Sequence, residues 1–265
     1  MNIFIHELRA NGKSTIIWSI SLVALVVLFL SLYPAFANDT EEYTKILAGY
    51  PESIRNAFGI NLENFFTILG FYCFPFSFIT LFGAIQAMNL GTAIVSKESR
   101  EKTADFLLTK PVTRSTVLTA KLLAATVSIV ITNIIYLAGG LLMANLVKTM
   151  DFSYQLFIMI SLTMFFIQLI FLALGIIISV LVRKIKSVLS VSLSTVFAFY
   201  FLGMLSDTSG EDAKRFITPF KYFDTSYIMK HSSYESSFVI VGAVIIILAI
   251  AGSYFVYTKK DIHAV

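Results

Sequence analysis

The chain has little charge and almost no cysteine. Only 14% of its 265 residues are Asp, Glu, Lys or Arg, whereas a soluble domain usually has about 25%. Hydrophobic residues make up 57% of the chain, so too little polar material remains to cover a soluble surface. The single cysteine, Cys73, excludes an internal disulfide and a cysteine-based zinc site. These shortages predict an integral membrane protein.

The sequence also lacks the patterns of a metal site and of a nucleotide site. Its three histidines are far apart in the chain and match no metal-ligand spacing. Residues 10–15, ANGKST, look like the end of a phosphate-binding loop, but that loop needs a glycine where this chain has Glu7. We therefore predict no catalytic, metal-binding or cofactor-binding residue, and no enzyme activity in this chain.

Long uncharged stretches are abundant instead. A membrane-spanning helix needs about 20 apolar residues, and six stretches free of Asp, Glu, Lys and Arg are long enough. They predict an all-α polytopic membrane protein in which residues 1–265 form one transmembrane domain. The predicted spans are residues 16–37, 65–95, 122–147, 153–182, 187–206 and 236–258. The second is longer than one straight helix requires, and Pro75 is a candidate break in it.

The distribution of basic residues predicts the orientation. Six spans place both chain ends on one side of the membrane, together with two of the loops. That side holds 13 of the 20 Lys and Arg residues but only 5 of the 16 acids. Because Lys and Arg are enriched in cytoplasmic loops, both termini are predicted to be cytoplasmic. The net charge of +4 then requires no nucleic-acid partner.

Residues 96–114, SKESREKTADFLLTKPVTR, carry eight charges between the second and third predicted spans. The first part is predicted to be a short helix, because Glu98 and Lys102 have opposite charges and lie four residues apart. Pro111 ends that helix, and Thr113 is a candidate cap for the next one. We call residues 97–114 the elbow.

The elbow suits contact with a soluble partner. A short amphipathic helix with an apolar end, such as Phe106 and Leu107, is suited to a groove on another protein. A solvated loop that obeys the orientation rule needs only two or three lysines, without interleaved acids and a capped turn. That plain loop remains the alternative to a docking segment.

Residues 94–124 resemble the first cytoplasmic loop of ABC exporter permeases of the type-2 family. The matching positions are Glu98, Lys102, Thr103, Leu107, Leu108, Pro111, Val112, Thr113, Arg114 and Lys121. Lys102 stands where many members have glycine. In that family this loop is the coupling helix that rests on the ATPase subunit. The resemblance implies an ATPase-coupling site formed by Glu98, Arg100, Glu101, Lys102, Thr103, Asp105, Phe106, Leu107, Lys110, Pro111 and Arg114.

Two other charged segments also resemble parts of this family. Residues 6–14, HELRANGKS, resemble its N-terminal interfacial helix, in which Glu7, Arg9 and Lys13 would face water. An ordinary charged flank is the alternative. Residues 207–237 resemble the external re-entrant segment before the sixth span, with a plain external loop as the alternative. Arg114 and Lys121 are expected to hold the third span at the phospholipid headgroups.

Uncharged polar residues inside the predicted spans are candidates for a transport pathway. These residues are Gln86, Asn89, Asn133 and Gln168. Hydrogen bonding between helices is the commoner role of such amides and stays open as the alternative. Gly175 is expected to allow close helix packing. Since no predicted span contains a formal charge, an ion-driven carrier is disfavoured.

The resemblance implies a six-span permease subunit of an ATP-driven exporter in a bacterial cell membrane. Two separately encoded ATPase subunits would bind the ATP and dock on the elbow, and the permease would pair with a second copy or a sister permease. Membrane lipid surrounds the chain. The alternatives are a non-transporting membrane anchor or sensor partner of an ATPase, and an ion-coupled secondary transporter.

Overall fold

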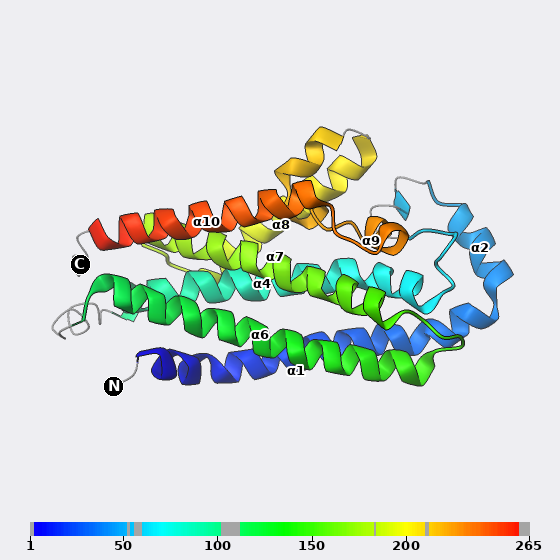
Figure 1. Cartoon of the computed structure of the whole chain (residues 1–265), viewed down its shortest axis with the longest axis horizontal. Coiled ribbons are helices and arrows are strands. Elements are labelled where there is room, and N and C mark those ends of the chain that lie inside the picture. Colours follow the sequence, from blue (N-terminus) through cyan, green and yellow to red (C-terminus); the bar gives the residue numbers. More distant parts are fainter. Residues whose placement is uncertain are drawn as a thin grey trace.

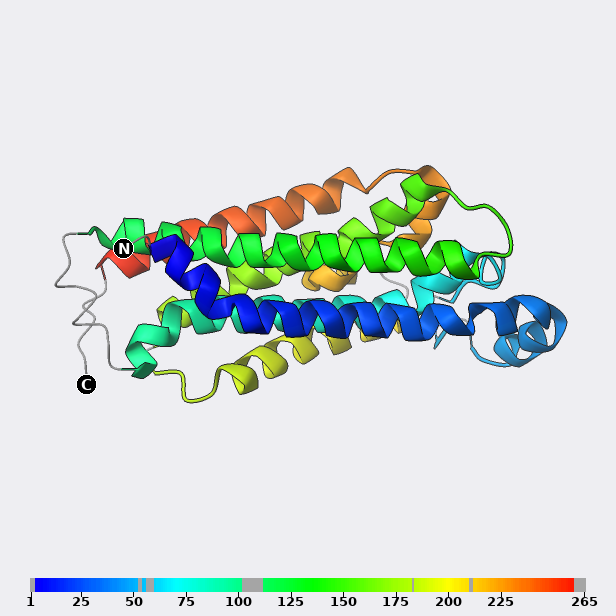
Figure 2. The same ribbon diagram turned by 90° about the horizontal axis from the view of Figure 1, so that it is seen from below.

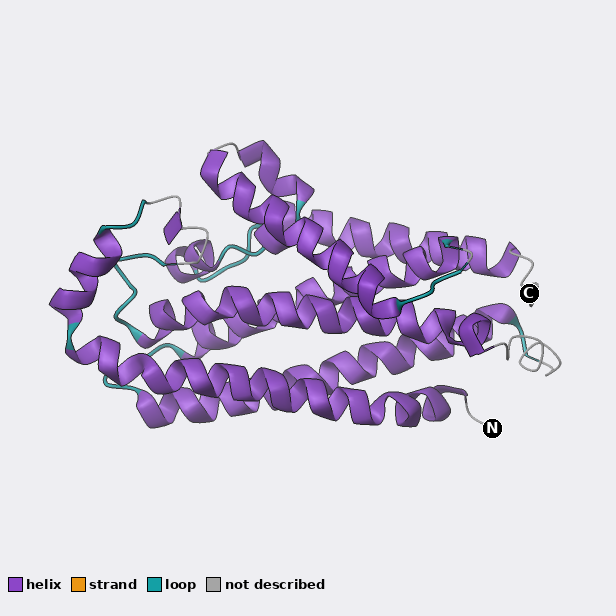
Figure 3. Cartoon of the chain, turned by 180° about the vertical axis from the view of Figure 1, so that it is seen from behind, coloured by secondary structure: helices purple, strands orange, loops and turns teal. Residues whose placement is uncertain are grey.

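The structure is a computed structural model that describes residues 3–51, 54–55, 60–101, 112–182, 184–209 and 212–259, without the side chains of residues 98–99, 101, 206–209 and 212–214. Every regular element in these ranges is a helix (Figure 3), which confirms the all-α prediction. The elements are α1 (Ile3–Asn38), α2 (Thr40–Ala48), α4 (Ile68–Glu101), α6 (Arg114–Val147), α7 (Tyr154–Leu181), α8 (Val188–Ser209), η1 (Asp212–Ile217), η2 (Pro219–Lys221), α9 (Thr225–His231) and α10 (Ser236–Lys259).

Six of these helices, α1, α4, α6, α7, α8 and α10, are long and apolar enough to cross a bilayer. This confirms the prediction of six spans, whereas the assignment of residues 1–265 to one domain stays a prediction. The long helices form an elongated bundle (Figure 1). One end holds the start of α1, the end of α10 and the arms of the elbow, and we call it the terminal end. The opposite end, with α2 and α9, is the distal end (Figure 1).

Two boundaries differ from the predicted ones. Pro75 lies inside α4 and does not break it, because helices inside a bundle satisfy the freed backbone groups through their neighbours. The described residues from Ile3 onward are the opening turns of α1, not a separate helix, although these turns bend away from the rest of α1 (Figure 2). An interfacial position for these turns stays a prediction.

Helices α4 and α7 form the centre of the bundle. In their apolar stretches, 72% and 61% of the residues are buried within the chain. A methyl group added at Gly91 would lie 2.5 Å from the carbonyl oxygen of Leu172, and one at Gly175 would lie 2.7 Å from that of Met88. Small residues therefore bring the two backbones close together, as is common between membrane helices and as expected for Gly175.

The other long helices surround this pair. Helices α1 and α6 pack on each other, α10 packs on α7, and α8 packs mainly on α4. Only 22% of the apolar stretch of α8 and 17% of that of α10 is buried. Their large apolar side chains, such as Leu205 and Ile240, point out of the bundle. This outer surface has the composition of one that faces lipid.

The segment between α8 and α10 folds back onto the distal end. Its side chains Tyr222 and Ile228 are almost fully buried, and the hydroxyl of Tyr234 donates a hydrogen bond of 2.7 Å to the carbonyl oxygen of Met159 in α7. Burial raises the pKa of Tyr234 to about 12. The segment is thus part of the packed structure, and its re-entrant position in the membrane stays a prediction.

Candidate functional site

The arms of the elbow are described, but its tip is not. Seven of the eleven predicted coupling residues lie outside the described residues: Lys102, Thr103, Asp105, Phe106, Leu107, Lys110 and Pro111. The backbones of Glu98 and Glu101 belong to the last turn of α4, where the side chain of Arg100 is exposed. Arg114 is half-buried at the first position of α6.

Thr113 caps α6, as predicted. Its backbone is extended (φ −74°, ψ 150°), and its side-chain oxygen accepts a hydrogen bond of 3.2 Å from the amide of Thr116. Such a cap satisfies one of the amides that the first turn leaves without an intrahelical partner. The second arm of the elbow therefore begins where the local sequence places it.

An ion pair ties the first arm of the elbow to α1. Lys97 Nζ lies 3.8 Å from Glu7 Oε2, and the Glu7 side chain is only 6% exposed. The prediction that Glu7 faces water is wrong, because α1 packs against its neighbours from its first turns and this side of it faces α4. Arg9 and Lys13 are exposed, as expected.

A buried lysine ties α6 to α4 close to the elbow. Lys121 has no exposed surface, and its Nζ donates a hydrogen bond to the carbonyl oxygen of Ile94 in α4. The prediction that Lys121 lies at the lipid headgroups is therefore wrong. The headgroup role of Arg114 stays a prediction.

A row of polar side chains runs along α1 from Glu7 toward the middle of the bundle. The members are four residues apart, and each bonds the carbonyl of the member before it: Asn11 to Glu7 at 2.9 Å, Thr15 to Asn11 at 3.0 Å and Ser19 to Thr15 at 2.7 Å. Residues four apart share one helix face. Glu7, Thr15 and Ser19 are buried, so this face points into the bundle.

Ser19 begins a chain of buried hydrogen bonds across four helices. Its hydroxyl proton, which the Thr15 carbonyl oxygen also accepts, is shared with Thr132 Oγ1 at 3.2 Å, and Gln86 donates to the same Thr132 oxygen at 2.9 Å. Gln168 donates to Gln86 at 3.0 Å, and Asn133 donates to Gln168 at 2.6 Å. Helices α1, α6, α4 and α7 are thereby joined in their interior.

Three of the four predicted pathway residues belong to this chain of bonds. Gln86 and Gln168 are nearly or fully buried, while Asn133 and Asn89 are half-buried. Asn89 is the one of the four that does not take part in this series of hydrogen bonds. Their mutual bonds are those of interhelical contacts. Contact with a transported molecule stays a prediction for all four.

A cavity of about 450 Å³ opens in the distal half, among α4, α7, α8 and the segment from η2 to α9. One part of its lining is apolar and includes Cys73, Phe76, Ile167, Met204, Phe220 and Phe223. Another part is polar and includes Ser77, Thr80, Thr163, Tyr200, Thr225 and Ser226. The charged groups in the lining are Lys221, Asp224 and Lys230. The volume is within the range of small-molecule sites, but the cavity is partly open and its lining is more polar than is usual for such sites.

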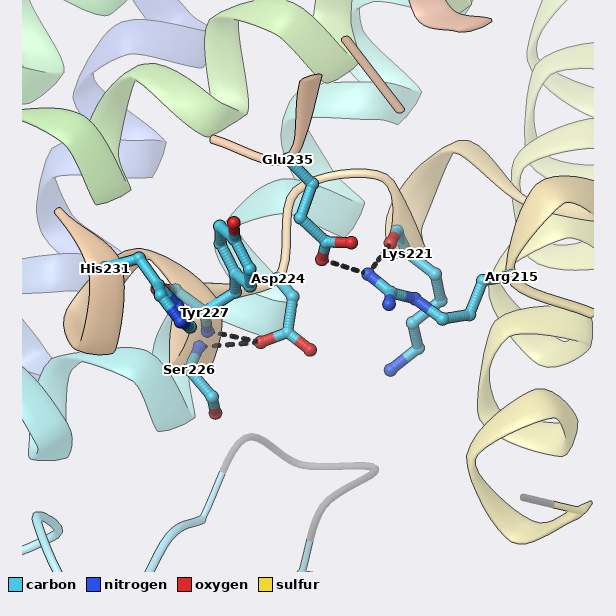
Figure 4. A network of polar contacts seen from close by, with 7 residues as sticks. All are labelled: Arg215, Lys221, Asp224, Ser226, Tyr227, His231 and Glu235. Atoms are coloured by element: carbon cyan, nitrogen blue, oxygen red, sulfur yellow. Dashed lines mark hydrogen bonds and ion pairs between the residues drawn. The ribbon is translucent and has the colours of Figure 1, made fainter. Parts of the chain in front are cut away.

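The charged border of the cavity is held in place by hydrogen bonds (Figure 4). Arg215 Nη2 lies 2.6 Å from Glu235 Oε1 and 3.3 Å from the carbonyl oxygen of Lys221. Asp224 Oδ1 accepts bonds of 2.7 and 3.2 Å from the amides that begin α9. Figure 4 shows the side chains of Lys221 and Asp224 extending to the same side of this segment.

The sequence interpretation did not identify Glu7, Lys121 or the cavity lysines as a set. The sequence does carry a signal for the burial of Glu7, since polar residues at positions 7, 11, 15 and 19 recur at the spacing of one helix face. Lys121 is followed by Ser128 and Thr132 on the same face of α6, and both are buried. Nothing in the local sequence around Lys221 and Lys230 brings them to one cavity.

These features define a six-helix integral membrane protein with charged arms at one end and a polar cavity at the other. The sequence family described as ABC-2 family transporter protein matches residues 1–262. The chain belongs to this family and is a membrane permease of the ABC transporter type, which confirms the resemblance. Comparison with curated proteins finds no match for the chain.

Proposed function

We propose that the chain is the membrane subunit of an ATP-driven exporter and is coupled to separate ATPase subunits through the elbow, residues 97–114. Two such subunits bind and hydrolyse the ATP. The permease pairs with a second copy of itself or with a sister permease. Both of its termini and the elbow lie in the cytoplasm, because the loops on that side hold 13 of the 20 basic residues.

The observation that carries this proposal is a pair of contacts, made by Lys97 and Lys121, that join helices at and next to the elbow. Lys97, at the start of the elbow, contacts Glu7 in α1, and Lys121, in the part of α6 that follows the elbow, bonds the carbonyl oxygen of Ile94 in α4. A solvated loop needs no such attachment. Because these contacts join α4 to α1 and to α6 beside the elbow, a movement of the elbow moves the three helices together.

The polar interior supplies the route by which such a movement reaches the distal half. The row on α1 leads from Glu7 to Ser19, and the bonds from Ser19 through Thr132 to Gln86 join α1, α6 and α4. Helix α8 has no part in these bonds among the described side chains. A shift of α4 against α8 therefore changes the shape of the cavity between them.

The ion-coupled alternative depends on an ionisable group in the transport pathway. Glu7 and Lys121 are buried, which removes the argument that the spanning helices carry no charge. However, both lie at the terminal end, engage Lys97 and Ile94, and are absent from the cavity lining. Transport in proteoliposomes without the ATPase would support an ion-coupled carrier, and a stable complex without transport would support an anchor.

A double substitution in the elbow tests the proposal. Glu98→Lys reverses a charge and Phe106→Ala removes an apolar anchor, whose truncation at a protein interface commonly costs about 2 kcal/mol or more. We expect loss of ATPase co-purification and of transport-linked hydrolysis, with membrane insertion retained. The matched control is Glu42→Lys with Ile46→Ala on exposed α2. Wild-type co-purification and hydrolysis in the elbow variant would reduce the elbow to a plain loop.

A further inference from the structure

The opening of the distal cavity offers a ligand one charge of each sign. Lys221, Asp224 and Lys230 line the cavity, and Asp224 and Lys230 are exposed. Lys221 already takes part in an interaction within the protein. Lys230 forms no ion pair among the described side chains, and the two amide hydrogen bonds to Asp224 use only its Oδ1 atom. One carboxylate oxygen and one ammonium group are therefore left at the opening.

These two charges belong to one short helix, which sets the distance between them. Asp224 caps the start of α9, and Lys230 lies six positions later in its last turn. At a rise of about 1.5 Å per residue, the two positions are about 9 Å apart along the helix axis. Three extended residues of a peptide span at most about 10 Å. A peptide of this length can therefore reach Asp224 with its amino group and Lys230 with its carboxylate.

The hydroxyl groups of the lining are acceptors and not donors for a ligand. Thr80 in α4 donates its hydroxyl proton to the carbonyl oxygen of Ser77 at 2.9 Å, and Thr163 in α7 donates to that of Met159 at 3.4 Å. Because a hydroxyl group has one proton and two acceptor lone pairs, both oxygen atoms can still accept a hydrogen bond. The backbone amides of a peptide are donors and suit this part of the lining.

Apolar side chains make up another part of the lining. Phe76 of α4 and Ile167 of α7 contribute to it, as do Phe220 and Phe223 of the segment before α10. Apolar side chains of a peptide would be removed from water on these residues, which favours binding. The volume of about 450 Å³ is sufficient for a small ligand.

We infer that this cavity binds a short apolar peptide of about three residues with free termini. Its amino group meets Asp224, its carboxylate meets Lys230, and its side chains pack on Phe76 and Phe223. The inference deepens the proposed function, on which it rests, by assigning a substrate class to the permease. A ligand with a single charge would satisfy only one of the two charged groups at the opening.

The test measures the equilibrium binding of trileucine to the purified full chain in phosphatidylcholine nanodiscs by isothermal titration calorimetry, without ATPase or ATP. Empty nanodiscs correct for partition into lipid. N-acetyl-trileucine lacks the positive charge and trileucine amide lacks the negative one, so each should bind about threefold more weakly, as for the loss of an exposed ion pair. Triglycine should bind about a hundredfold more weakly or worse, because it has no apolar side chains to bury.

Two substitutions assign each terminus of the peptide to its partner. Asp224→Asn removes the charge but keeps a residue that caps helices well, and Lys230→Gln removes the charge at similar helix propensity. Asp224→Asn should weaken binding of trileucine about threefold and leave that of N-acetyl-trileucine unchanged. Lys230→Gln should weaken trileucine to the same extent and leave trileucine amide unchanged. Lys45→Gln, at an exposed lysine of α2 at the same end, should leave the affinity for every peptide unchanged.

Three results would overturn the inference. They are an absence of trileucine binding, equal affinities for trileucine and its two blocked forms, and a variant that weakens the free and the blocked peptide equally. Because the assay contains no ATPase, failure of the ATP-coupling proposal would leave its outcome unchanged. Conversely, an absence of peptide binding would leave the co-purification of the ATPase unaffected.

Discussion

The two ends of the bundle are built differently. At the terminal end, Glu7, Lys97 and Lys121 are drawn into contacts between α1, α4 and α6. At the distal end, a cavity lies among α4, α7 and α8, and Lys221 and Lys230 border it. The first arrangement keeps helices together and the second leaves space between them. A transporter that is driven from one end needs both, a firm attachment where force enters and a space whose shape can change.

The helices also differ in how deeply they are buried. The central helices α4 and α7 are 72% and 61% buried in their apolar stretches, whereas α8 is only 22% buried. Helix α8 contacts the bundle mainly through α4 and the short segments that follow it. Among the helices that border the cavity, α8 is therefore the one that can move with the smallest loss of packing.

Removal of the buried lysine at the terminal end should cause the largest loss of unfolding free energy. Lys121→Ala removes a hydrogen bond from a charged group at a site without solvent, and such bonds contribute about 1.5–3 kcal/mol. We expect a loss of unfolding free energy of that size and uncoupled ATP hydrolysis. The control is Lys13→Ala, an exposed lysine at the same end. Equal melting curves for both variants would show that Lys121 does not hold the arms together.

The central helix pair should respond nearly as strongly. In Gly175→Ala the added methyl group would lie 2.7 Å from the Met88 carbonyl oxygen, so the backbones must separate. Overpacking of this kind typically costs about 1–3 kcal/mol. The matched control is Gly12→Ala, where no atom lies within 4 Å. Denaturation in detergent should separate the two variants, and a more stable Gly175→Ala would contradict the packing described.

The Glu7–Lys97 ion pair should contribute less to stability than to coupling. Its N–O separation is 3.8 Å and Lys97 is 28% exposed, so Glu7→Gln should cost below about 1 kcal/mol. Coupling should still weaken, because the first arm loses its attachment to α1. The exchange Glu7→Lys with Lys97→Glu should restore coupled hydrolysis. If the exchange is no better than Glu7→Gln alone, the pair does not transmit movement.

The exposed pair at the distal end should have the smallest effect. A hydrogen bond from Lys148 lowers the pKa of Asp151 and raises that of Lys148. The Asp151 contribution is lost as the pH falls through its lowered pKa, and the Lys148 contribution as the pH rises through its raised pKa. Because Asp151 is 95% exposed, Asp151→Asn should leave the melting temperature unchanged at about pH 7. A clear decrease in the melting temperature of Asp151→Asn at this pH would show that exposed ion pairs also stabilise the distal end.

The sequence predicts the features that depend on local pattern. Six spans follow from the length of uncharged stretches, and the Thr113 cap follows from one hydroxyl before a helix. The positions of Glu7 and Lys121 could not be predicted in this way. Their burial depends on which helices pack together, and the charge of a residue near a span end argues for exposure until its partner is known.

The contacts inside the bundle could not be predicted from the sequence. The amides Gln86, Asn133 and Gln168 were candidates because amides are rare in spans, and the structure brings them together. The sequence could not show that they bond to one another, nor that the cavity lies elsewhere. The lysines that border it, Lys221 and Lys230, follow α8 in a segment of short helices whose packing on α4 and α7 is not visible in any periodic pattern.

The most direct test of ATP coupling is a pair of spin-label distances measured by double electron–electron resonance in the assembled transporter. With Cys73→Ser as background, one label pair at Arg9 and Ser115 reports on the terminal end. A second pair at Phe82 and Phe201, both exposed, reports on α4 and α8 beside the cavity. Between the nucleotide-free and ATP-bound states, we predict a changed distance for the second pair and an unchanged one for the first. A change in the first pair with none in the second would contradict the account.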